Sequence, residues 1–207
     1  MNNKSPLRKN FGSDIISKKE INIKGKICLL GDNAVGKTSL IRRYVLDIFQ
    51  DKYISTIGTK ITKKSVMLRH PKENVKINMT LLIWDIMGDM NSLPEIIHSY
   101  NKYSAQKKYF ENAKGAMIVC DITRKNTLNN IDDWVTSLNE VAGDVPKLFL
   151  GNKSDLQAIS KVEPKDLEEI SSQFNCKHLF TSAKTGQNVE NAFSKLSKLM
   201  AYSFLKK

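Results

Sequence analysis

The stretch GDNAVGKT, Gly31–Thr38, decides the fold, because it fits the phosphate-loop pattern G-x-x-x-x-G-K-[ST]. An apolar run that predicts a buried strand, Ile23–Leu30, precedes it, and a predicted helix, Lys37–Ile48, begins inside it. Backbone N–H groups of such a loop wrap phosphates, and the helix N-terminus adds positive potential. We expect the Lys37 ammonium to meet the outer phosphates and the Thr38 hydroxyl to bind Mg²⁺. The stretch therefore predicts a nucleotide site between a strand and a helix.

Strands and helices alternate along the rest of the chain. Apolar or alternating runs predict strands at 60–69, 75–84, 115–121, 146–151 and 177–181. Apolar residues at helical spacing, or a Pro at the first position, predict helices at 127–142, 164–174 and from about 187 to the end. The stretch HPKEN, 70–74, predicts a hairpin turn between the first two of these strands. This order predicts an α/β fold with a mostly parallel sheet, covered on both faces, and one antiparallel edge strand.

Two further motifs indicate which base is bound. In GNKSD, Gly151–Asp155, the Asp155 carboxylate can accept from the guanine N1–H and exocyclic amine, a donor pair that adenine lacks. Asn152 is expected to hold the guanine edge and tie the two loops together, while Lys153 lies along the base. In TSAKTG, which follows the next strand, the Ala183 N–H is expected to meet the guanine O6. Three motifs, each at the C-terminal end of a predicted strand, favour a guanine-nucleotide site.

The segments GDNAVGKTSLIRRY, DKYISTIG, LLIWD, GNKSDL and TSAKTGQNVE together resemble the Rab-like branch of the Ras superfamily of small GTPases. The resemblance covers about residues 22–202. It implies a P-loop G domain with a six-stranded sheet and five helices, which switches between GDP and GTP with Mg²⁺. It also implies protein effectors and regulators that bind through residues 49–62 and 85–112.

The resemblance also assigns roles to single residues. Thr56 would close on Mg²⁺ and the γ-phosphate, Asp85 would hold Mg²⁺ through a bound water, and the Gly88 N–H would bond the γ-phosphate. Phe49 stands where a ring edge meets guanine, and Tyr53 where a tyrosine covers the phosphates. The implied nucleotide contacts are Asn33, Ala34, Val35, Gly36, Lys37, Thr38, Ser39, Phe49, Tyr53, Asn152, Lys153, Asp155, Ser182, Ala183 and Lys184. The implied catalytic residues are Lys37, Thr56, Gly88 and Asp89, and the metal ligands are Thr38, Thr56 and Asp85.

Two departures from the family pattern bear on hydrolysis. Asp89 stands where the family has a water-orienting glutamine, and an ionised aspartate can only accept hydrogen bonds and repels a triphosphate. Asn33 and Ala34 occupy loop positions where small residues, often glycine, are usual. We therefore expect slow intrinsic hydrolysis. Two alternatives remain: Asp89 acts as a general base with a raised pKa, or the chain is a GTP-binding interaction module with negligible turnover.

The segment from Gly88 to Ala113 is about ten residues longer than the family's second switch. Its apolar side chains suit either a partner surface or packing on the domain. They are Leu93, Pro94, Ile96, Ile97, Tyr100, Tyr103, Tyr109 and Phe110.

The 207-residue chain has a net charge of +12, and its first 26 residues hold seven Lys and Arg against two acidic residues. We expect residues 1–20 to form a flexible basic extension and 21–207 the G domain. The extension suits either a solvated tail or contact with an anionic membrane. No cysteine lies near the end, so no prenyl anchor is expected. We expect a cytoplasmic or peripheral-membrane monomer with reduced cysteines. A nucleic-acid binder is the weakest alternative, because no Arg-rich helix or RNA-binding aromatic pattern is present.

Overall fold

The computed structural model describes residues 19–51, 54–69, 75–88 and 107–206. Its strands are β1 (Lys19–Leu30), β2 (Thr59–Arg69), β3 (Val75–Ile86), β4 (Ala113–Asp121), β5 (Lys147–Asn152) and β6 (Lys177–Thr181). Its helices are α1 (Lys37–Leu46), α3 (Asn126–Asn129), α4 (Ile131–Ala142), the 3₁₀ helix η3 (Ser154–Ile159), α5 (Pro164–Gln173) and α6 (Val189–Leu205).

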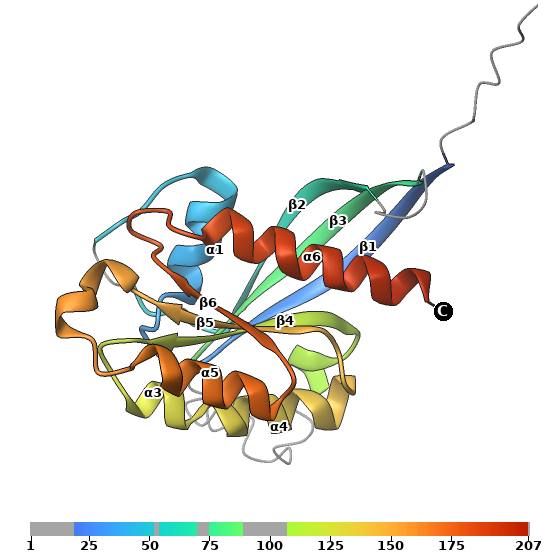
Figure 1. The fold of residues 1–207 in the computed structure, drawn as a ribbon. Coiled ribbons are helices and arrows are strands. Elements are labelled where there is room, and N and C mark those ends of the chain that lie inside the picture. Colours follow the sequence, from blue (N-terminus) through green and yellow to red (C-terminus); the bar gives the residue numbers. More distant parts are fainter. Residues whose placement is uncertain (1–18, 52–53, 70–74, 89–106, 207) are drawn as a thin grey trace, which may run out of the picture.

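The six strands form one sheet in the order β2-β3-β1-β4-β5-β6. Only β2 and β3 pair antiparallel, and the other neighbours pair parallel. Figure 1 shows α1 and α6 on one face of the sheet and α3, α4 and α5 on the other. The predicted α/β fold, with a mostly parallel sheet and one antiparallel edge, is confirmed. In the part of the chain that the structure describes, a helical turn at 107–110 accompanies the five α-helices and η3 named above.

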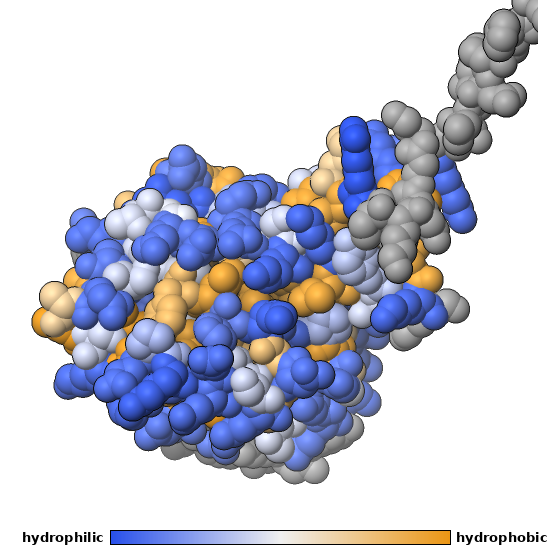
Figure 2. All heavy atoms as spheres, in the orientation of Figure 1, coloured by the Kyte–Doolittle hydropathy of each residue, from blue (hydrophilic) through white to orange (hydrophobic). Residues whose placement is uncertain are grey.

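Two apolar layers hold the helices on the sheet. One joins α1 and α6 to alternate residues of β1 and β3, and Phe193 of α6 stacks on Tyr44 of α1 with ring centroids 3.8 Å apart. The other joins α4 and α5 to the opposite face of β1, β4 and β5. Central strands are buried on both faces, which explains their unbroken apolar runs. The outer surface of the helices is mostly hydrophilic, with apolar side chains visible where α6 meets the sheet (Figure 2).

The structure differs from the sequence predictions at two elements. The helix predicted over 127–142 is broken at Asn130, where the chain separates α3 from α4. There the Asn130 amide donates to Asp32 Oδ2 at 2.8 Å, and Trp134 Nε1 donates to Asp32 Oδ1 at 3.2 Å. Strand β1 begins at Lys19, four residues before the predicted start and inside the predicted extension, because it pairs with β3 as far back as Val75. Residues 1–18 and the turn at 70–74 lie outside the described residues.

The cysteines agree with the expectation of free thiols. Cys28 and Cys120 are buried and Cys176 is half-buried, and all three are free. Burial raises the pKa of Cys28 and of Cys120 to about 12, so neither is a reactive thiolate. None of the helices within the described ranges has both the length and the apolar character needed to cross a bilayer.

Candidate functional site

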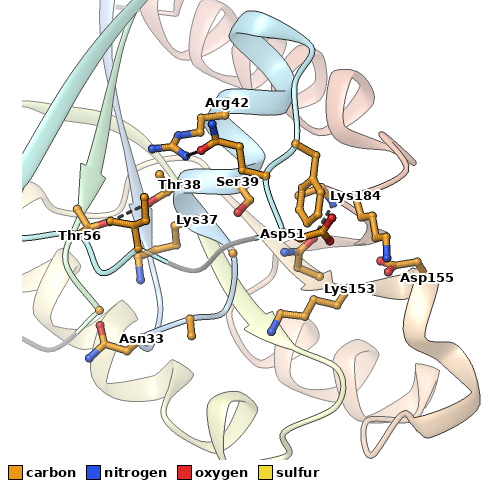
Figure 3. A pocket seen from close by; sticks show the side chains of 18 of the residues that line it. Asn33, Lys37, Thr38, Ser39, Arg42, Asp51, Thr56, Lys153, Asp155 and Lys184 are labelled. Carbon is orange, nitrogen blue, oxygen red and sulfur yellow. Dashed lines mark hydrogen bonds between the residues drawn. The ribbon is translucent and has the colours of Figure 1, made fainter.

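A cavity of about 300 Å³ lies at the C-terminal edge of the sheet, against the N-terminus of α1 (Figure 3). The loops that follow β1, β3, β5 and β6 all reach it, because the carboxyl ends of parallel strands meet at one edge. Its lining residues are Asn33, Ala34, Gly36, Lys37, Thr38, Ser39, Arg42, Ile48, Phe49, Gln50, Asp51, Ile54, Thr56, Gly88, Asn152, Lys153, Asp155, Leu156, Ala183 and Lys184.

The loop after β1 is folded around Lys37. The Lys37 ammonium donates to the carbonyl oxygens of Gly31 at 2.6 Å and Asp32 at 2.8 Å, and only 6% of the residue is exposed. Burial lowers the pKa of Lys37 to about 8, against the opposing effect of Asp85 and Asp32. Gly36 has φ +101°, and a Cβ there would lie 2.3 Å from the Asn152 side-chain nitrogen. The turn thus depends on glycine for both its backbone angle and its close approach.

Beside Lys37, two hydroxyls and a carboxylate converge. Thr38 Oγ1 donates to Asp85 Oδ2 at 2.6 Å and lies 2.8 Å from Thr56 Oγ1, the contact drawn in Figure 3. Asp85 is 2% exposed, and its Oδ1 is buried without a hydrogen-bond partner among the described residues. Burial raises the pKa of Asp85, opposed by the Thr38 hydrogen bond and by Lys37. Hard oxygen atoms with one spare buried acceptor fit a Mg²⁺ ion that keeps several of its waters.

Asn152 connects the first loop to the loops after β5 and β6. Its side-chain amide donates to Val35 O at 2.8 Å. Its Oδ1 accepts from Thr181 Oγ1 at 3.2 Å and from the Ala183 N–H at 3.3 Å. All three contacts are buried, so this side chain fixes the spacing of the loops.

Asp155 and Lys153 extend from the same loop. Asp155 is exposed at the cavity, and its Oδ1 accepts from Ser182 Oγ at 2.6 Å. Lys153 has φ +69° and donates to Asp121 Oδ2 at 2.6 Å. Burial acts to raise the pKa of Asp121, but hydrogen bonds from Lys153 and Thr123 outweigh it, so the pKa is lowered. Figure 3 shows Lys153, Asp155 and Lys184 at one end of the cavity and Thr56 at the other.

Three residues that sequence reasoning did not assign support these loops. Arg43 on α1 donates to Ala183 O at 3.0 Å and Lys184 O at 2.7 Å, which holds the loop after β6. Arg124 donates to Asp121 Oδ2 at 3.0 Å and to Asn33 O at 2.7 Å. Asp121 could have been found, because it ends a predicted strand at the same edge of the sheet.

Most of the predicted site residues meet at this cavity. Gly88 lies against the first loop, because a Cβ there would be 2.4 Å from the Asn33 nitrogen. Phe49 lines the cavity and packs, half-buried, on the core. Val35 and Ser182 are not among the lining residues. They contact residues that are, because Val35 O accepts from Asn152 and Ser182 Oγ donates to Asp155. Tyr53 and Asp89 lie outside the described residues.

The long segment after Gly88 is described only from residue 107 onward. Its last two aromatic residues, Tyr109 and Phe110, are buried in the core on the α4 side of the sheet. For these two, packing on the domain is confirmed and the partner-surface alternative is wrong, because the sheet face at Cys28 needs an apolar cover. The other apolar residues of the segment, 93–103, lie outside the described part of the chain.

Comparison with known proteins agrees with this geometry. The model of the Ras family matches residues 26–202. "Ras-related protein Rab-13" of Bos taurus is 33% identical over 174 residues, which covers 84% of this chain and 78% of the relative. "Ras-related protein Rab-21" of Geodia cydonium is 32% identical over 187 residues, covering 90% and 75%. "Ras-related protein Rab-8B" of Homo sapiens is 33% identical over 174 residues, covering 84% and 76%. The family match and these relatives, together with a cavity where the loops after β1, β5 and β6 meet, show that the chain belongs to the Ras family and is a Rab-like, GTP-binding small GTPase.

Proposed function

We propose that this small GTPase is a Mg²⁺-dependent switch between GDP- and GTP-bound states, with slow intrinsic hydrolysis. The observation that carries the proposal is the contact between Thr38 and Thr56, whose oxygens lie 2.8 Å apart. Thr56 precedes β2, on a segment whose neighbours Ile54 and Ile57 are exposed. A hydroxyl that reaches the phosphate loop from an exposed segment can couple the bound nucleotide to a partner surface.

The three oxygen-bearing residues divide the binding of Mg²⁺. The Thr38 and Thr56 hydroxyls would hold the ion, and Asp85 would hold one of its waters through the buried Oδ1 that lacks a partner. The ion supplies neutralisation of charge on the outer phosphates. Lys37 would meet those phosphates with the N–H of its ammonium that the Gly31 and Asp32 carbonyls do not use.

Slow hydrolysis follows from the chemistry of position 89. Gly88 abuts the Asn33 backbone of the phosphate loop, and Asp89 follows it in the sequence. An ionised Asp89 there can accept from water but cannot donate toward the γ-phosphate, and its charge opposes that of the triphosphate. We therefore assign it a weaker role than that of the glutamine found in the family. A raised pKa that made Asp89 a general base would give the opposite result.

An interaction module with negligible hydrolysis is the second candidate. The observation that favours it is the exposed Asn33, whose carbonyl Arg124 holds at 2.7 Å. That bond fixes the backbone of Asn33, and its exposed side chain at the cavity takes up space that an incoming group from an activating protein would use. In both candidates, effectors and regulators bind residues 49–62 and 85–112, and the basic residues 1–20 contact anionic membrane.

The test is single-turnover hydrolysis of [γ-³²P]GTP, with bound nucleotide measured in the same samples. Asp89→Gln is compared with wild type and with Asp132→Gln, an exposed position on α4. We expect a slow wild type, at least about a tenfold gain in Asp89→Gln and no change in Asp132→Gln. A wild type that already turns over rapidly, with no gain from glutamine, contradicts the slow switch. Tight GTP binding with no turnover in either protein supports the interaction module.

A further inference from the structure

Strands β1, β2 and β3 run past the helices toward one end of the molecule (Figure 1). Side chains alternate along each strand, and one set packs under α1 and α6. The other set forms the opposite face, which we call the outer sheet face. The register places its residues in rows across β2, β3 and β1: Arg69–Lys76–Glu20, Met67–Asn78–Asn22, Ser65–Thr80–Lys24 and Lys63–Leu82–Lys26.

The outer sheet face is strongly cationic. Lys24, Lys63 and Arg69 are exposed, and no ion pair joins any of them to another described residue. Lys76 pairs with Glu20 at 3.2 Å, and that carboxylate is the only one in the four rows. These three unpaired cations need an anionic partner or remain solvated.

The cations stand on a sheet surface whose strands are joined by backbone pairing and by side-chain hydrogen bonds. The Asn78 amide donates to Asn22 Oδ1 at 3.1 Å and also to Glu20 Oε1, which locks β3 to β1 on this face. Met67 stands in the same row and is 64% exposed. From Lys63 to Arg69 and across three strands, the face measures about 20 Å by 10 Å. The outer sheet face therefore combines several exposed cations with one exposed apolar side chain, Met67.

We propose that the outer sheet face docks on the surface of an anionic lipid bilayer. A lipid surface is flat and carries its charge in headgroups, so the three cations can meet phosphates and carboxylates while Met67 enters the interface. Nucleic acid fits less well, because the aromatic residue at the near end of this face, Trp84, is covered by the Lys26 ammonium at 3.6 Å. The ammonium occupies a ring face on which a base would otherwise stack.

The charge of the rest of the chain favours the same orientation. Residues 126–175, which run from α3 through β5 and η3 to α5, hold nine acidic residues against four lysines. The helices α4 and α5 pack on the same face of the sheet but toward β4 and β5, so an anionic surface attracts the end formed by β1, β2 and β3 and repels the end that carries these helices. The basic segment 1–18 continues into β1 at the docking end, with four Lys and Arg against one acidic residue. The inference extends the membrane contact proposed for residues 1–20 to a folded surface, and it does not depend on hydrolysis.

The test is co-sedimentation of the GDP-loaded full chain with phosphatidylcholine vesicles that contain either no or about 30 mol% phosphatidylserine, at about 0.1 M salt. The docking variant is Lys24→Gln, Lys63→Gln and Arg69→Gln together. The matched control, Lys161→Gln, Lys165→Gln and Lys177→Gln, removes the same charge from exposed positions before α5, on α5 and at the start of β6, the other edge strand of the sheet. Fluorescent GDP binding by each variant shows that the fold is retained.

We expect wild type to bind only the anionic vesicles. The partition coefficient onto the anionic vesicles should fall about a hundredfold in the docking variant, which is about fivefold for each cation removed. In the control it should fall less than about threefold. Met67→Ser should bind the anionic vesicles severalfold more weakly, with the same dependence on salt concentration as wild type. The proposal is overturned if the docking variant and the control behave alike. It is also overturned if binding depends only on Lys4, Arg8, Lys9 and Lys18, or if the docking variant loses binding to a DNA duplex but not to vesicles.

Discussion

Asn152→Ala should destabilise the fold and loosen the nucleotide together, because one side chain holds three loops. The substitution leaves three buried groups without partners: the Val35 carbonyl, the Thr181 hydroxyl and the Ala183 N–H. Asn152 itself is 1% exposed, so water does not reach these groups without a rearrangement. The substitution should therefore lower the free energy of unfolding as well as the affinity for the nucleotide.

The size of the effect follows from these three bonds. A buried group left unsatisfied costs about 1–3 kcal/mol, and two of the contacts, at 3.2 and 3.3 Å, are long. Taking about 1 kcal/mol for each gives a loss of about 3 kcal/mol in the free energy of unfolding. The matched control is Asn130→Ala, which removes one exposed bond, to Asp32 at 2.8 Å. It should cost less than about 1 kcal/mol.

Urea unfolding at several GDP concentrations measures both effects. Extrapolation to zero ligand gives the intrinsic free energy of unfolding, and the dependence on GDP gives the affinity. We expect Asn152→Ala to lose about 3 kcal/mol and to release a fluorescent GDP at least tenfold faster than Asn130→Ala. If the two variants match in stability and in release rate, Asn152 does not join the loops as argued here.

Three further substitutions probe single contacts. The pKa of Lys37 is about 8 in the fold, against 10.5 for a free lysine, so the unfolded chain binds more protons between these values and stability rises with pH there. In nucleotide-free protein, Lys37→Met should remove up to about 1.4 kcal/mol of that rise per pH unit, measured by urea unfolding from pH 7.5 to 10. Asp155→Asn should cut the preference for GDP over ADP at least tenfold in competition binding, and an unchanged ratio would refute the base-reading role. Gly88→Ala would place a methyl 2.4 Å from the Asn33 nitrogen, so it should weaken the binding of GTP more than the binding of GDP. Equal losses of affinity for the two nucleotides would argue against contact with the γ-phosphate.

Local sequence patterns were sufficient for most of the fold. The strand at 177–181 has the bounds that its pattern predicted, and the predicted end of the fourth strand, Asp121, is also the observed end. The break at Asn130 was not predictable from helical periodicity, which continues across it, and the side chain at the break donates to Asp32, 98 residues away in sequence. The early start of β1 was accessible in principle, since Ile21 and Ile23 alternate with polar residues. An apolar run marks only the part of a strand that is buried on both faces.

The site was predictable where chemistry requires a residue type at a fixed spacing, and less so where support depends on the reach of a side chain. Thr38 and Asp85 belong to motifs, and the structure brings them to 2.6 Å. Arg124 belongs to no motif that we recognised, and its contact with Asn33 spans 91 residues. A long flexible side chain at a strand end can reach several loops, so sequence spacing does not select one of them.

The supporting contacts explain why the first loop can receive an anion. Its carbonyl oxygens at Gly31, Asp32, Asn33 and Val35 accept hydrogen bonds from three side chains: Lys37, Arg124 and Asn152. In a trans peptide the N–H points away from the carbonyl, so fixing these oxygens turns the following N–H groups the other way. Arg124 and Asn152 can keep their bonds when phosphate arrives. Lys37 can keep both of its carbonyl contacts as well, because its ammonium has three N–H groups and these contacts use two of them. Its third N–H is therefore available to a phosphate oxygen. Negative charge that enters the cavity would raise the lowered pKa of Lys37 and so favour its charged form.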